Sequence, residues 1–117
     1  MSWIGVDLDG CLSENKYSPG EIGAPVWPMV DRVKTWLAEG KEVRIFTARL
    51  YPHGRKISLD REAVVRSIQE WCVKYIGVPL EVTCEKDFQM YCLYDDRCRQ
   101  VEANTGRVLT EGGWTFS

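Results

Sequence analysis

Residues 3–11 read WIGVDLDGC, a short apolar run that ends in two aspartates and a glycine. The β-branched residues in this run predict a buried strand, and Gly10 predicts the turn that ends it. Aspartate is disfavoured in strands and costly to bury without a partner. Asp7 and Asp9, with one leucine between them, therefore predict a compensating charge, most simply a bound cation.

Two arrangements of this aspartate pair remain open. If the strand continues through Asp9, both side chains point the same way, because residues two apart in a strand share a face. If the strand gives way at Leu8, Asp9 offers its backbone carbonyl instead. Oxygen ligands of either kind suit Mg²⁺ better than zinc. The plainer alternative is that the two acids only end a strand at a polar turn, since Asp before Gly is common in turns.

Size and composition predict one domain, residues 1–117, with a single core. Hydrophobic residues at 44% and charged residues at 27% are ordinary for a globular protein and indicate neither disorder nor a membrane protein. No basic region leads into a long apolar segment, so no secretion signal is predicted and a cytoplasmic location is expected. The net charge of −2 argues against a surface dedicated to coating nucleic acid. The five cysteines form no Cys-x-x-Cys pair, so we expect reduced thiols.

After the first strand the chain alternates helical and strand patterns, joined by segments rich in turn-forming residues. Helices are expected over 28–39, over 58–75 and from after Asp96 to about Asn104, and further strands over 43–47, 80–84, 91–94 and 107–110. Strand, helix and strand in this order, with short joints, make the βαβ unit, whose strands are parallel and whose crossover is right-handed. We therefore expect an α/β fold with a mainly parallel five-stranded sheet and helices on both faces.

Polar residues follow each of the first four predicted strands. Parallel sheets of this class bind ligands at the carboxyl ends of their strands, where these residues would meet. They are Asp7 and Asp9 after the first strand, Thr47 after the second, Lys86 after the third, and Asp95 and Asp96 after the fourth. A second strand that ends in two acids is hard to attribute to turn chemistry alone, which favours the cation site.

The order of these motifs resembles the four signature motifs of the haloacid dehalogenase (HAD) superfamily, whose members are mostly Mg²⁺-dependent phosphatases. The motifs are Asp-Leu-Asp-Gly at 7–10, Phe-Thr-Ala-Arg at 46–49, a lysine, and Tyr-Asp-Asp-Arg at 94–97. The resemblance runs from Trp3 to about Leu109 and implies the three-layer Rossmann-like fold of that family. Residues 77–97 are also similar to the phosphatase half of phage polynucleotide kinase.

The resemblance implies hydrolysis of a phosphate monoester through an aspartyl-phosphate intermediate. Asp7 would be the nucleophile, and Asp9 would protonate the leaving oxygen and then deprotonate the attacking water. Asp95, with Asp96, would hold Mg²⁺ together with Asp7, and the backbone carbonyl of Asp9 would also face the metal.

The same resemblance implies three phosphate-binding groups. Thr47 and the amide of Ala48 would hydrogen-bond to phosphate oxygens, and Lys86 would add positive charge at the transferring group. Cys11 occupies a position where the family usually has Thr or Val. Cysteine is small and apolar, so we expect this change to be tolerated.

Neither residues 11–27 nor the loop at 49–57 is long enough to fold as a separate cap domain, so the resemblance implies a capless member. An open site accepts bulky substrates or needs a partner subunit to shield it from water. The expected substrate is therefore a phosphorylated molecule such as a nucleotide or a nucleic-acid end, and a homo-oligomer remains open. His53 and the charges of the 49–57 loop either touch substrate or are ordinarily solvated. Trp114 and Phe116 either close the core or form a subunit contact.

Two other functions compete with the phosphatase. One is a receiver-type binding module, which accepts phosphate on aspartate once, on a small parallel sheet. Receivers place that aspartate after the third strand, whereas here Asp7 follows the first. The other is an inactive scaffold of the same fold, since fold alone does not establish activity.

Overall fold

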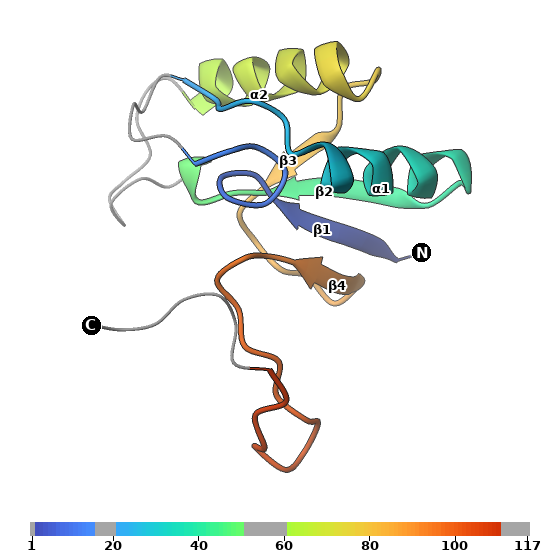
Figure 1. Ribbon diagram of the computed structural model, residues 1–117, viewed down its shortest axis with the longest axis vertical. Coiled ribbons are helices and arrows are strands. Elements are labelled where there is room, and N and C mark those ends of the chain that lie inside the picture. The colour runs from blue at the N-terminus through green and yellow to red at the C-terminus, as the bar shows by residue number, and fades with distance from the viewer. Residues whose placement is uncertain (1, 16–20, 51–60, 111–117) are drawn as a thin grey trace.

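Four parallel strands form a sheet at the centre of the protein, in the order β3-β2-β1-β4 (Figure 1). The strands are β1 (Trp3–Asp7), β2 (Glu42–Phe46), β3 (Glu81–Thr83) and β4 (Met90–Tyr94). The computed structural model describes residues 2–15, 21–50 and 61–110. Because β1 lies between β2 and β4, the first and fourth predicted strands are direct neighbours. Their carboxyl ends therefore meet at one edge of the sheet.

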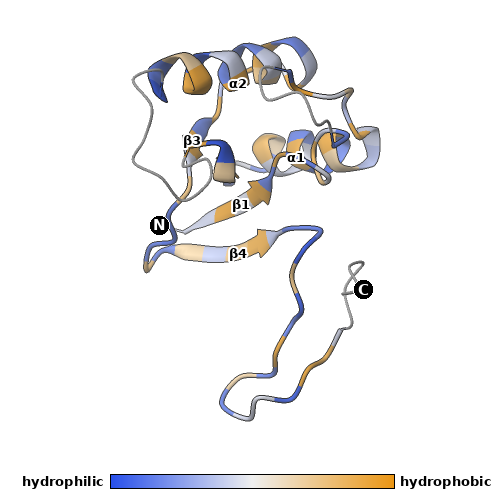
Figure 2. Ribbon diagram, turned by 90° about the vertical axis from the view of Figure 1, so that its left-hand side faces the viewer, coloured by the Kyte–Doolittle hydropathy of each residue, from blue (hydrophilic) through white to orange (hydrophobic). Residues whose placement is uncertain are grey.

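Two α-helices, α1 (Trp27–Ala38) and α2 (Arg61–Tyr75), pack on one face of this sheet (Figure 2). The core contains Ile4, Val6, Val43 and Ile45 from the strands, Met29, Val30 and Val33 from α1, and Ile68, Trp71 and Cys72 from α2. The chain steps from β1 to β2 to β3 in one direction, so right-handed crossovers place both helices on the same side. The prediction of helices on both faces is thus wrong for the part of the chain that the structure describes. No helix in that part is long and apolar enough to cross a membrane.

On the opposite face of the sheet, the described residues form a polar network around Trp3 and contribute no helix. Trp3 is only 1% exposed, and the guanidinium of Arg44 lies 4.6 Å from its ring centroid. The indole Nε1 donates to Asp87 at 2.8 Å, and Arg44 contacts the same carboxylate at 3.4 Å. Asp87 belongs to the connection between β3 and β4, so this connection closes the second face over Trp3.

The bounds of the main elements lie close to those predicted. The helix expected over 28–39 is α1, with Pro28 in its first turn, and the helix expected to end at 75 is α2. Gly40 and Gly77 follow these helices with φ of +82° and +109°, which is the left-handed conformation that favours glycine at a helix end. All five cysteines are free, as expected.

The segment after β4 differs from its prediction. Residues 95–110 contain neither the expected short helix nor the fifth strand, and the described sheet has four strands. The chain instead folds back on itself as an arm that projects from the domain (Figure 1), with one bridge between Val101 and Val108. Positive φ values at Asn104 and Gly106 make the reversal. The apolar residues that were expected to form the fifth strand, within 107–110, instead pair with other residues of the arm and not with the edge of the sheet.

Several predictions fall on residues outside the described ranges. They concern the 51–57 part of the second loop with His53, the cap at Ser58, and the tail with Trp114 and Phe116.

Candidate metal and phosphate site

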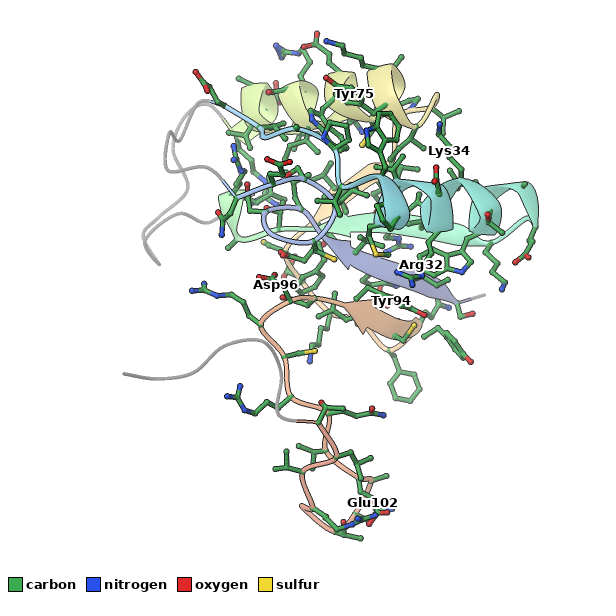
Figure 3. All side chains as sticks on the ribbon, viewed as in Figure 1. Arg32, Lys34, Tyr75, Tyr94, Asp96 and Glu102 are labelled. Carbon is green, nitrogen blue, oxygen red and sulfur yellow. The ribbon has the colours of Figure 1, made fainter. Side chains whose placement is uncertain are left out.

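Three carboxylates meet where β1 and β4 end. Asp7 is the last residue of β1, and Asp95 and Asp96 follow β4 directly. One oxygen from each of the three lies within 4.8 Å of the others, and all three residues are half-buried. Figure 3 shows Asp96 just past the end of β4, toward β1. The structure thus brings together three of the four predicted metal-binding residues.

This acidic cluster, Asp7 with Asp95 and Asp96, crowds negative charge into a partly desolvated place. Burial, followed by the charge of Asp95 and contacts with Asp96, raises the pKa of Asp7 from 3.8 to about 8. Carboxylate oxygens are the kind of ligand that Mg²⁺ prefers, and a divalent cation would offset the repulsion among them. The residues present therefore fit the metal that the sequence predicts.

The raised pKa of Asp7 predicts that stability without metal falls as pH rises. The folded state binds this proton more tightly than the unfolded chain, so the free energy of unfolding decreases between about pH 4 and about pH 8. Because the Asp7 carboxyl is partly exposed, we expect the free energy of unfolding to fall by about 2 kcal/mol, well below the value that the full pKa shift would give. Thermal unfolding in a chelator at pH 5 and at pH 8 measures this decrease. Added Mg²⁺ should restore stability at pH 8. Identical pH slopes for wild type and Asp7→Asn would contradict the assignment.

A tight turn after β1 sets the position of the neighbouring residues. The carbonyl of Leu8 accepts the N–H groups of Leu12 and Ser13 at 3.0 and 2.9 Å, and both leucine side chains are fully buried. Gly10 sits in this turn with φ of +88°, and a Cβ there would lie 2.6 Å from Oδ2 of Asp96. Only glycine allows the turn to approach the acidic cluster this closely.

Gly10→Ala is expected to displace Asp96 as well as strain the backbone. Both effects together should lower stability by about 1–3 kcal/mol and weaken Mg²⁺ binding roughly tenfold. Gly40→Ala is the matched control, because Gly40 has a similar φ of +82° but nothing within 4 Å of its Cβ position. Thermal melts and Mg²⁺ titrations of the two variants separate strain from collision. Equal Mg²⁺ affinities would show that Gly10 does not shape the site.

Asp9 is oriented differently from Asp7. The strand ends at Asp7, so the two aspartates do not share a strand face, and the carboxylate of Asp9 is not part of the acidic cluster. It pairs with Arg49 through two contacts, Nη2 to Oδ1 at 2.7 Å and Nε to Oδ2 at 2.8 Å. Sequence reasoning placed Arg49 in the Phe-Thr-Ala-Arg motif and among the charges of the 49–57 loop but gave it no partner, because nothing local indicates which carboxylate it meets. A metal contact through the Asp9 carbonyl stays a prediction.

A cavity of about 290 Å³ opens beside these groups. It is lined by Asp7, Asp9, Asn15, Phe46, Thr47, Ala48, Asp95 and Arg97. The cavity therefore joins the predicted nucleophile Asp7, the predicted acid–base residue Asp9 and two of the three predicted phosphate-binding residues. Asn15, Phe46 and Arg97 were not predicted as site residues, although Phe46 and Arg97 belong to the quoted Phe-Thr-Ala-Arg and Tyr-Asp-Asp-Arg motifs. Lys86 is exposed and is not among the lining residues.

Thr47 is held firmly at the cavity. It is 2% exposed, its N–H donates to the carbonyl of Thr83 at 2.9 Å, and its hydroxyl accepts the N–H of Arg49 at 3.1 Å. The first contact extends the pairing of β2 with β3 by one residue. The Thr47 hydroxyl is thereby fixed at the same edge of the sheet as Asp7.

Comparison with known proteins supports the fold. No protein-family model and no curated protein matches the chain. A solved structure of a conserved protein from Bacteroides thetaiotaomicron is similar, with a TM-score of 0.52 and 22% sequence identity. The similarity covers 82% of this chain and 76% of that chain. At this identity it shows the fold alone, a small α/β domain with a parallel sheet.

Proposed function

We propose that the protein is a Mg²⁺-dependent phosphatase of the HAD type, without a cap domain, that hydrolyses phosphate monoesters. The observation that carries the proposal is the meeting of Asp7 with Asp95 and Asp96, at carboxylate spacings that suit one cation, beside the buried hydroxyl of Thr47. These residues come from distant parts of the chain. The same groups occur in the motif order of the HAD superfamily.

The nucleophile of this reaction would be the carboxylate of Asp7. Phosphate monoesters need accelerations of up to ~10²¹, so a path that divides one displacement into two is expected. An Asp7 oxygen attacks phosphorus, the bond to the leaving oxygen breaks, and Asp9 gives that oxygen a proton. Asp9 then takes a proton from water as the water attacks the aspartyl-phosphate, which frees Asp7 and phosphate. Bound Mg²⁺ supplies positive charge that offsets the repulsion between carboxylates and phosphate.

Phosphate oxygens would be bound by the second motif. The Thr47 hydroxyl accepts the Arg49 N–H, which leaves its hydrogen to donate to a phosphate oxygen. Ala48 lines the cavity, so its amide is the second proposed donor. Lys86 is the third by resemblance alone, and its exposed position means that its side chain would have to turn toward the phosphate.

The dimensions of the cavity favour a substrate whose bulk stays outside. A volume of about 290 Å³ lies just below the range of pockets that enclose most of a drug-sized ligand, so the cavity would hold the phosphate and only part of the rest of the substrate. The described segments that border the cavity form no cap over it. We propose a nucleotide or an oligonucleotide phosphate end as the substrate.

A phosphatase panel tests the function. The full chain is assayed with an aryl phosphate, mononucleotides and an oligonucleotide 3′-phosphate, in Mg²⁺ and in a chelator. We expect repeated turnover only with Mg²⁺ and the highest rate on the oligonucleotide. Equal rates on nucleotide and oligonucleotide would refute this expected preference for the oligonucleotide. A single phosphorylation event without turnover would indicate a receiver-type module, and no reaction would indicate an inactive scaffold.

A further inference from the structure

A bidentate ion pair between Arg49 and Asp9 stands at the edge of the cavity. Besides its two contacts with Asp9, Arg49 Nη2 donates to the carbonyl of Glu21 at 2.7 Å. The two paired side chains are only 18% and 25% exposed. Two parallel N–H contacts make the strongest pairing that a guanidinium forms with a carboxylate. Both oxygens of Asp9 are therefore engaged by a residue that the reaction described above does not use.

The backbone places Arg49 next to the proposed phosphate position. It lies in the 3₁₀ turn η1 (Ala48–Leu50), which is anchored by Leu50 at 2% exposure and by the contact of the Arg49 N–H with Thr47. Thr47 and Asp9 both line the cavity, so a phosphate bound there lies beside the carboxylate that Arg49 holds. A guanidinium fork fits phosphate as well as carboxylate geometry, and a phosphate dianion carries more charge.

We propose that Arg49 is a phosphate-binding residue for which Asp9 competes, so that phosphate binding draws the guanidinium away from Asp9 and frees this side chain to take up a proton from water and donate it to the leaving group. The inference rests on the proposed function, because it needs phosphate in this cavity. In this proposal, Arg49 contacts either Asp9 or phosphate, but not both at once. The Asp9 contact keeps Arg49 at the edge of the cavity but also weakens phosphate binding, since its two hydrogen bonds must be given up.

A double-mutant cycle separates this exchange from simple charge effects. Removing the Asp9 charge strengthens anion binding in any case, but by the same factor with or without Arg49 if the two do not compete. With competition, Asp9→Asn strengthens phosphate binding much more when Arg49 is present, because the substitution frees the guanidinium. Coupling of residues that share a partner is commonly large enough to change an affinity about tenfold.

The experiment measures binding of inorganic phosphate to the full chain by calorimetry at saturating Mg²⁺. The variants are Asp9→Asn, Arg49→Met and the double substitution, with thermal melts to verify folding. We expect Asp9→Asn to tighten binding about tenfold with Arg49 present and less than about threefold in the Arg49→Met protein. Arg49→Lys keeps the charge but not the fork, and should restore only part of the difference.

The Arg107–Glu102 pair on the arm is the matched control. It has the same chemistry, with Nη2 to Oε2 at 2.9 Å, away from the cavity. Its cycle of Glu102→Gln and Arg107→Met should leave phosphate binding unchanged. Equal effects of Asp9→Asn in both Arg49 backgrounds, or no phosphate binding by any variant, would overturn the inference. If wild type turns over substrate but the effects of the two substitutions on phosphate binding are additive, only the role of Arg49 is rejected. A coupled cycle without turnover rejects the phosphatase and keeps the phosphate site.

Discussion

Asp7→Asn is expected to lower phosphatase turnover by about 10³-fold or more while the protein stays folded. An amide of nearly the same shape cannot form the proposed aspartyl-phosphate, so the two-step reaction through that intermediate is lost. The substitution also removes the carboxylate whose pKa burial and neighbouring acids raise to about 8. The variant should therefore be at least as stable as wild type at pH 8 in a chelator. Steady-state turnover of an aryl phosphate and thermal melts measure both effects.

Asp31→Asn is the control for this experiment. It makes the same change of charge on an exposed residue of α1, so turnover should stay within about twofold of wild type. Unchanged turnover in Asp7→Asn would remove Asp7 from the mechanism. A variant that loses turnover because it no longer melts cooperatively would count against a catalytic role, since the shape of the side chain is kept.

Asp95→Asn is expected to weaken Mg²⁺ binding by about 10- to 100-fold, which is typical when a group that holds or orients a metal is altered. Asp95 is one of three residues whose oxygens lie within 4.8 Å of one another, and it lines the cavity with Asp7. Its carboxylate Oδ1 also accepts the N–H of Arg97 at 2.9 Å, a contact that the amide oxygen of asparagine keeps. The substitution therefore changes charge more than local structure.

The Mg²⁺ dependence of the melting temperature and of turnover measures this effect by two independent readouts. If Asp95 binds the metal, both titrations shift to higher Mg²⁺ concentration, and turnover recovers in part at saturation. Asp31→Asn again supplies the control. Titrations that coincide with those of wild type would exclude Asp95 from the metal site.

Local pattern was sufficient for most of the regular elements. The apolar runs around Val6 and Ile45 form strands, and glycines end both helices, because strand and helix formation here follow short-range preferences. The same reasoning failed after Asp96. Val108 and Leu109 look like a strand, but two positive φ values upstream turn the chain back, and the pairing partner becomes Val101. The sequence of one apolar segment does not determine which other segment it pairs with.

The candidate site, like the fold, could be predicted from the sequence only in part. Sequence alone determined that acids follow the strands ending at Asp7 and Tyr94, that a threonine follows β2, and that oxygen ligands for Mg²⁺ are available. Only the tertiary structure decided that β4 lies beside β1, which brings Asp95 and Asp96 to Asp7, and that Asp9 meets Arg49. Strand order and the direction of a side chain in a tight turn depend on contacts between distant residues. Those contacts form only when the whole sheet is assembled.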